Sequence, residues 1–345
     1  MNWIDFQRQS YELTEKELAI LTKDIIENYR QVYNNVDALL KEQYLKYLSA
    51  VNTADYYNEL IKYNRLTNLK AEISSIYLRY DKLNGQTISD ILATGFQGVY
   101  NRQMFAASWL IPDLAVRAIP KDLMSLAING TVQNWKNITQ SIINRYGSMS
   151  LYQPMTGTLA ELLKANSTAG LRTILSQLSQ GLVSGQSYTD ITRALRRTIG
   201  ETMIINGEKA YSGALYKTLR IVQTESNRVM NDAAYAQSMS LQADGQDVYK
   251  IWIATLDDRT RDTHAELDGE KIRPDEEFVT SDGDRALSPG NFREASNNIN
   301  CRCSIAEVIG DFMPEARRGR DPVTGENEVF SYKTYEEWAV EKGLK

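Results

Sequence analysis

The sequence is poor in the residues that build disulfide frameworks and most metal centres. Its 345 residues include two cysteines, one histidine and seven prolines. Cys301 and Cys303 stand one residue apart and cannot form a disulfide framework, which favours a reducing compartment. No apolar run is long enough to cross a membrane, and the N-terminus lacks the basic start and apolar core of a signal peptide. We therefore expect synthesis in the cytoplasm and no membrane partner.

A strong net charge of either sign is also absent, because the formal net charge is −5. Residues 241–345 carry 14 Lys and Arg against 23 Asp and Glu, a net charge of −9, which leaves +4 for residues 1–240. An ordinary solvated surface is the favoured explanation of this division. The alternative is a mildly basic helical part that contacts double-stranded DNA, beside an acidic part that avoids it. A strong DNA-binding protein would be far more basic.

Long helices are predicted for the first half of the chain. Residues 14–48 place apolar side chains at helical spacing, and residues 55–83 repeat the pattern as far as Asn84-Gly85, a pair typical of a helix end. Shorter helices are predicted between residues 87 and 199. Ser187 and Asp190 form a capping box before the last of them. A hairpin at Asn206-Gly207 and a helix over 214–243 follow.

The histidine and both cysteines fall in one stretch, residues 250–305. Its beginning is rich in β-forming residues and predicts a strand, followed by a helical turn capped by Asp257 or Asp258. Asp268-Gly269 predicts a turn into a second strand, and residues 303–309 predict a third. The stretch reads W-x-x-T-x-D-x-R-T-R-x-x-H-x-x-L-D-G and then N-C-R-C. These positions are Trp252, Thr255, Asp257, Arg259, Thr260, Arg261, His264, Leu267, Asp268, Gly269, Asn300, Cys301, Arg302 and Cys303.

This order of residues resembles the phage Mu F-like minor head protein family, over roughly residues 190 to 310. The resemblance implies a minor head protein of the virion, associated with the portal or the inner capsid and acting in head morphogenesis, DNA packaging or DNA ejection. Its partners would be the portal and other capsid proteins. A DNA-binding protein ejected with the genome is the first alternative, and a cryptic enzyme is the second.

The expected fold class is α+β, with a mostly helical N-terminal part and a small domain that contains a short antiparallel sheet. We expect a helical region over 1–186, a Mu F-like domain over 187–310 and a C-terminal tail with a short helix over 311–345. The polar stripe Arg220, Thr224, Asn227 and Asn231 on the helix before the strand is interpreted as a hydrogen-bonding network.

The motif cluster allows two interpretations. His264, Cys301 and Cys303 are zinc ligand types. The resemblance implies a C-x-x-C where this chain has Arg261 and His264, so a fourth ligand would have to come from a carboxylate such as Asp257 or Asp268. The favoured alternative is a metal-free clasp that joins the two motif blocks and contains no cofactor. Its members would be Trp252, Asp257, Arg259, Arg261, Asp268, Gly269, Asn300 and Arg302.

Catalysis is the least favoured interpretation of the cluster. The sequence contains no G-x-S-x-G, no Walker A motif, no H-E-x-x-H and no carboxylate pair with a recognisable spacing. No third residue can be identified that would orient a Cys–His pair. We therefore expect that the chain is not an enzyme, has no catalytic residues and takes no small-molecule substrate.

Overall fold

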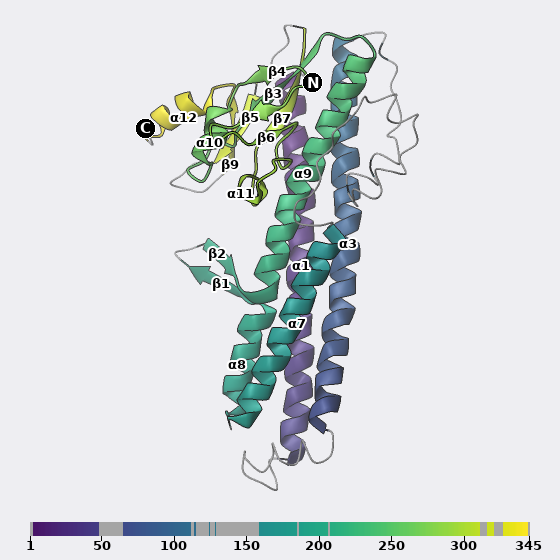
Figure 1. The fold of residues 1–345 in the computed structure, drawn as a ribbon, viewed down its shortest axis with the longest axis vertical. Helices are drawn as coiled ribbons and strands as arrows, with labels where there is room; N and C mark the ends of the chain where they lie inside the picture. The colour runs from purple at the N-terminus through teal and green to yellow at the C-terminus, as the bar shows by residue number, and fades with distance from the viewer. Residues whose placement is uncertain are drawn as a thin grey trace. The chain divides into compact units, whose positions relative to one another are not determined.

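The computed structural model describes residues 3–47, 65–111, 114, 124, 128, 159–184, 186–205, 208–310, 316–320 and 327–343. A mostly helical N-terminal part with long helices is followed by a mixed part with small antiparallel sheets, which confirms the predicted fold class (Figure 1). The helices are α1 (Trp3–Tyr47), α3 (Arg65–Leu110), α7 (Leu159–Val183), α8 (Tyr188–Ile199), α9 (Gly213–Ala243), α10 (Asp262–Glu266), α11 (Ala295–Asn298) and α12 (Tyr335–Glu341). The strands are β1 (Thr202–Ile205), β2 (Glu208–Tyr211), β3 (Val248–Ile253), β4 (Lys271–Ile272), β5 (Phe278–Val279), β6 (Arg285–Ala286), β7 (Ser304–Ile309), β8 (Ala316–Arg320) and β9 (Asn327–Ser331). None of the helices within these ranges is long and apolar enough to cross a membrane.

The chain forms two compact units. Unit 1 comprises Met1–Leu18, Asp90–Leu159 and Val222–Lys345, and unit 2 comprises Ala19–Ser89 and Ala160–Ile221. The predicted boundaries after residues 186 and 310 concern independently folding segments, and they stay predictions.

Unit 2 is a helical bundle with polar contacts between its helices. Antiparallel α1 and α3 bring Asn28 opposite Asn84, and the two side chains hydrogen-bond at 2.8 Å. The hydroxyl groups of Tyr29 on α1 and Thr218 on α9 lie 2.7 Å apart in the interior. Burial raises the pKa of Tyr29 to about 12. These buried polar contacts fix the register of the helices, because each would be left unsatisfied by a shift along the axis.

Three predicted helix boundaries are wrong. The first helix was predicted to begin at residue 14, but α1 begins at Trp3. α3 continues through Asn84-Gly85 as far as Leu110, because Ile88, Phe96 and other apolar side chains recur every four residues and are buried. That burial and the Asn28 hydrogen bond outweigh the cost of about 1 kcal/mol for a glycine inside a helix. Likewise, the segments 157–164 and 171–183 were predicted as separate helices, but one helix, α7, covers both and contains Gly170.

The helix-capping predictions had mixed outcomes. Ser187 caps α8 by accepting a hydrogen bond from the backbone N–H of Asp190, as predicted. The turn that becomes α10 has Arg261 at its N-cap and no side-chain cap, so the predicted aspartate cap is wrong. The β1–β2 hairpin and α9 are present as predicted, whereas the joint near residue 52 and the helix predicted over residues 132–145 lie outside the described residues.

Unit 1 is built around a three-stranded antiparallel sheet of order β4-β3-β7. Along β3, five of the six residues are buried, including Lys250, which is fully buried. The Lys250 ammonium group donates hydrogen bonds to the carbonyl oxygens of Pro274, Glu276 and Leu287 at 2.6–2.8 Å. Burial lowers the pKa of Lys250 to about 7. Three acceptors match the three protons of the charged form, so we interpret Lys250 as an ammonium that fastens the 273–300 loop to the sheet.

Glu307 lies opposite Lys250 on β7 and faces α9, where its carboxyl group accepts a hydrogen bond from Ser238. Burial raises the pKa of Glu307 from 4.5 to about 8. A carboxyl group with a raised folded-state pKa contributes full stability below 4.5, and this contribution is lost as the pH rises through 8.

We therefore expect Glu307→Gln to remove part of the decline in stability between pH 5 and pH 8, by roughly 1–3 kcal/mol at pH 8. Urea unfolding at several pH values measures the effect. Glu266→Gln on the exposed side of α10 is the matched control and should leave the pH profile unchanged. Parallel profiles for wild type and Glu307→Gln would contradict the prediction.

Candidate functional site: a buried histidine–cysteine cluster and its polar ties

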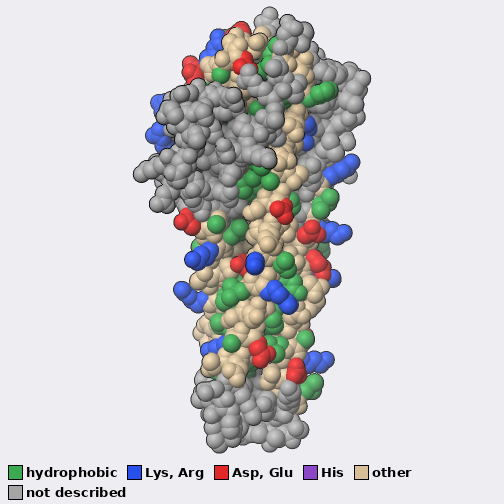
Figure 2. Space-filling model, turned by 90° about the vertical axis from the view of Figure 1, so that its right-hand side faces the viewer, with side chains coloured by type: hydrophobic (Ala, Val, Ile, Leu, Met, Phe, Trp, Pro, Cys, Tyr) green, Lys and Arg blue, Asp and Glu red, His purple; other side chains and the backbone are tan. Residues whose placement is uncertain are grey.

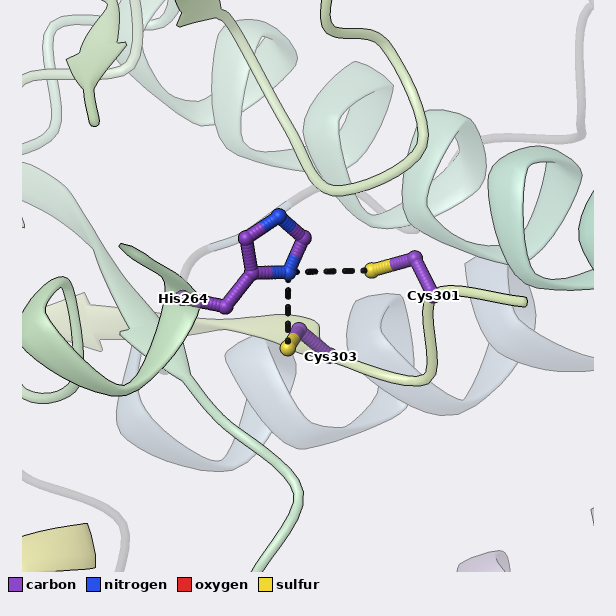
Figure 3. Close-up of side chains that lie close together, drawn as sticks. All are labelled: His264, Cys301 and Cys303. Atoms are coloured by element: carbon purple, nitrogen blue, oxygen red, sulfur yellow. Dashed lines mark hydrogen bonds between the residues drawn. The ribbon is translucent and has the colours of Figure 1, made fainter. Parts of the chain in front are cut away.

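His264, Cys301 and Cys303 meet in the interior of unit 1. His264 lies on α10, and the cysteines lie on the segment that leads into β7 (Figure 3). The Nδ1 atom of His264 is 3.6 Å from the Sγ atom of each cysteine, and all three residues are at most 3% exposed. The two motif blocks therefore touch, as the sequence predicts.

Aromatic rings surround the cluster. The His264 ring lies edge-on to Trp252, with 5.5 Å between the ring centroids, and at 5.3 Å from Phe292. Its Nε2 atom is buried and has no hydrogen-bond partner among the described residues. The rings thus fix the orientation of the imidazole with Nδ1 towards the two sulfur atoms.

The two thiols influence each other's ionisation. The interaction between the two thiols lowers the pKa of Cys301 and raises the pKa of Cys303. Burial opposes the first effect and adds to the second. Cys301 is therefore the thiol that loses its proton more easily.

Charged hydrogen bonds tie the two motif blocks together beside the cluster. The Arg302 guanidinium donates two hydrogen bonds to the carboxylate of Asp257, whose side chain is 1% exposed. The same carboxylate accepts hydrogen bonds from the Arg259 backbone N–H and the Thr260 hydroxyl. The Arg259 guanidinium is 54% exposed and 3.9 Å from Asp257, so it adds little to this tie.

Further contacts hold the segment before β7. Arg261 donates a hydrogen bond to the carbonyl oxygen of Ile299, so this position joins the two blocks without a metal ligand. Asn300 has a positive φ of 57°, and its backbone N–H donates to Thr224 on α9. The Asn227 and Asn231 side chains donate to the Cys303 carbonyl oxygen. These contacts form the predicted network on α9, except that Arg220 lies outside it, over the ring of Tyr216.

Asp268 was predicted to join the two motif blocks or to serve as a fourth metal ligand, but it binds the C-terminal segment. Its carboxylate accepts hydrogen bonds from the Ala254 backbone N–H at 2.8 Å, the Tyr335 backbone N–H at 2.6 Å and the Arg317 guanidinium. Gly269 follows with a φ of 82°, a conformation that favours glycine. Arg317 and Tyr335 were not predicted as site residues, because both lie in the C-terminal segment, which carries no motif. The sequence offered only one indication of them, namely an arginine and aromatic residues in a short C-terminal segment.

The geometry fits a zinc site in part. A tetrahedral zinc ion at about 2.3 Å from sulfur and about 2.0–2.1 Å from nitrogen separates these atoms by about 3.6 Å. This matches the two N–S distances, and the three donor atoms lie within 4.8 Å of one another. Asp257 and Asp268 are held by Arg302 and Arg317, so neither is a ready fourth ligand. The role of the three residues as ligands stays a prediction.

Comparison with known proteins identifies relatives of two kinds. Residues 172–306 match the family model described as Phage Mu protein F like protein. The chain is 33% identical over 219 residues to NAD(+)--arginine ADP-ribosyltransferase EFV of Enterococcus faecalis, which covers 61% of this chain and 41% of that relative. It is 26% identical over 327 residues to Minor head protein GP7 of Bacillus phage SPP1, which covers 88% of this chain and 97% of that relative. No solved structure matches.

The prediction that the chain is not an enzyme is wrong, because a relative that shares 61% of the chain is named as an ADP-ribosyltransferase. The prediction rested on the absence of hydrolase, nucleotide-loop and metalloprotease motifs. Motifs of other enzyme classes therefore give no information about a transferase of this kind. The match spans less than half of that relative, which leaves the location of its activity outside what the comparison establishes.

Proposed function

Residues 172–306 match the Phage Mu protein F like family, and from this premise we propose that the chain is a minor head protein of a bacteriophage. The similarity to Minor head protein GP7 carries the proposal, because it extends over 97% of that protein and 88% of this chain. A shared domain alone would leave the helical N-terminal part unexplained. A match of nearly full length supports a common role for both parts.

The proposed partners are the portal and other capsid proteins, and the proposed location is the capsid interior or the portal vertex. The test is quantitative mass spectrometry of purified phage heads that were assembled with the chain. We expect the chain in few copies relative to the major coat protein, and we expect it to cross-link to the portal. Heads without the chain would overturn the proposal. Heads that contain the chain cross-linked only to coat protein would overturn the portal association alone.

A role in DNA ejection is the finer part of the proposal. The charge division suggests that any DNA affinity belongs to residues 1–240, which carry a net charge of +4. On the face of the molecule seen in Figure 2, basic and acidic side chains are interspersed along the helices, which favours weak binding. We expect a weak, salt-dependent shift of duplex DNA. Equal binding by a fragment of residues 241–345 would contradict this assignment.

Arginine ADP-ribosylation is the second candidate function, and the 33% identity to EFV favours it. The test incubates the purified full chain with labelled NAD⁺ and agmatine, a small guanidinium acceptor. Transfer of label to agmatine above the level of heat-denatured protein would support the activity. No transfer above this level would remove the candidate and leave the head-protein proposal untouched.

The role of the buried cluster is part of the same proposal. We propose that His264, Cys301 and Cys303 hold a structural zinc ion. The bound ion would tie α10 to the segment before β7 and act together with the Asp257–Arg302 and Arg261–Ile299 contacts. The N–S distances of 3.6 Å fit tetrahedral zinc, and the zinc content of the purified chain distinguishes the metal site from the metal-free clasp.

A further inference from the structure

The C-terminal segment packs on the motif as a strap. We use this name for residues 316–320 and 327–343, which lie beyond the end of the family match at residue 306. Strand β8 pairs with β9, and Gly319 bridges to Leu256 in the motif. On α12, Trp338 is fully buried against Leu256. The strap is therefore an integral part of unit 1.

One arginine of the strap, Arg317, lies in a buried polar site that we call the socket. The socket is formed by the Asp268 carboxylate and the carbonyl oxygens of Ala254 and Lys333. Arg317 is fully buried, and its guanidinium donates hydrogen bonds to both carboxylate oxygens of Asp268, at 2.7 and 2.8 Å. It also donates to the carbonyl oxygens of Ala254 and of Lys333, and the ring of Tyr332 lies 5.5 Å away. The two charged side chains are 1% and 2% exposed, so solvent screens this ion pair very little.

The socket matches the shape of a guanidinium group. A planar fork of N–H donors reaches a carboxylate through two parallel hydrogen bonds and reaches carbonyl oxygens on either side. A lysine ammonium group is a point charge and cannot make this set of contacts at once. Outside the strap, the Asp268 carboxylate also accepts a hydrogen bond from the Ala254 backbone N–H, and the Tyr335 backbone N–H of the strap supplies another.

Tyr335 connects the strap to the hydrophobic core that contains Cys301 and Cys303. The Tyr335 hydroxyl donates to the carbonyl oxygen of Asp257, and the Tyr335 ring packs against the core that contains Cys301 and Cys303. Opening of the strap would therefore expose one side of the core that contains the thiols.

We propose that Asp268 and Ala254 form a guanidinium-binding site, which the chain fills with its own Arg317, and that this contact closes the strap on the hydrophobic core that contains Cys301 and Cys303. The ligand class is a guanidinium cation on a peptide segment, and the source is the C-terminal segment of the same chain. The site is independent of the proposed head-protein function, because its evidence is the geometry of the socket alone.

Chemical rescue of a cavity tests the binding site. Arg317→Ala in the full chain removes the guanidinium and leaves Asp268 buried without its partner, so we expect the Tm to fall by about 6–12 °C. Millimolar N-ethylguanidinium should restore at least half of this loss, and ethylammonium at the same concentration should not. Wild type should respond to neither cation. Equal effects of the two cations on Arg317→Ala, or an equal response of wild type, would overturn the guanidinium site.

The reactivity of the two thiols tests whether Arg317 keeps the strap closed. This test uses Arg317→Lys, so it remains possible if Arg317→Ala does not fold. The chain has only two cysteines, so iodoacetamide alkylation reports on the cluster alone. We expect alkylation in Arg317→Lys to be about ten times faster than in wild type, because lysine cannot make the two parallel hydrogen bonds.

The matched control is Arg285→Ala, at an exposed arginine in the same unit, and it should react at the wild-type rate. The rates are measured with and without a chelator, which separates loss of metal from opening of the strap. A wild-type alkylation rate in Arg317→Lys under both conditions would overturn the closure.

Discussion

Replacing Asp257 with alanine is expected to lower the free energy of unfolding by about 3–5 kcal/mol. The side chain of Asp257 is 1% exposed and receives two hydrogen bonds from Arg302, one from the Arg259 backbone and one from Thr260. Without the carboxylate, the Arg302 guanidinium loses these two hydrogen bonds while it is only 25% exposed. Urea unfolding followed by tryptophan fluorescence measures the loss, because Trp252 is buried beside the motif.

Arg259→Ala is the matched control for Asp257→Ala. Its guanidinium is 54% exposed at 3.9 Å from the same carboxylate, so its loss should cost about 0–1 kcal/mol. The double variant of Asp257 and Arg302 to alanine should cost clearly less than the two single changes added together, because the two residues act as one unit. Equal costs for Asp257→Ala and Arg259→Ala would show that burial of the Arg302 contact has no energetic weight.

The second large effect is expected at the histidine–cysteine cluster. His264→Ala removes a ring that is 1% exposed and packed against Trp252 and Phe292, and it also removes the proposed zinc ligand. The lost packing alone should cost about 2–4 kcal/mol. We further expect near-stoichiometric zinc in the purified wild-type chain and a clear loss of zinc in His264→Ala and Cys301→Ser, measured by elemental analysis.

Phe292→Leu separates the two contributions at this cluster. It weakens the packing around the imidazole but removes no donor atom, so zinc content should stay at the wild-type level while stability falls. Chelation should lower the Tm of wild type and of Phe292→Leu, with no further effect on His264→Ala. A wild-type chain that contains no zinc and does not respond to chelation would make the cluster a metal-free clasp. Unchanged stability in both His264→Ala and Cys301→Ser would reject the structural role itself.

Much of the site could be read from sequence because its signals are local. Tyr249, Ile251 and Ile253 predict β3, and the turn chemistry of Asp268-Gly269 predicts the return to β4. The loop between the two motif blocks is long and polar, so contact between its ends was expected from chain closure. The structure brings His264 to both cysteines, in agreement with that expectation.

The errors arose where packing outweighs local preference. Asn84-Gly85 is a helix-ending pair in isolation, but Asn84 is 4% exposed and hydrogen-bonded to Asn28, a residue 56 positions away. Asp257 is a good helix cap by type, but its carboxylate is taken by Arg302 from the other motif block. In both cases, a partner distant in sequence stabilises a conformation that the neighbouring residues do not favour.

The sequence by itself determined the long helices, the strands of the sheet and the chemical types gathered at the motif, because periodicity, turn residues and ligand types are properties of short segments. Which groups lie together in the interior depends on the tertiary structure alone. Lys250 is buried among three carbonyl oxygens, and Arg317 contacts Asp268, which is 49 positions away in the sequence. A buried charge is tolerated only where several partners from separate segments meet it, and that condition depends on the folded arrangement of the whole unit.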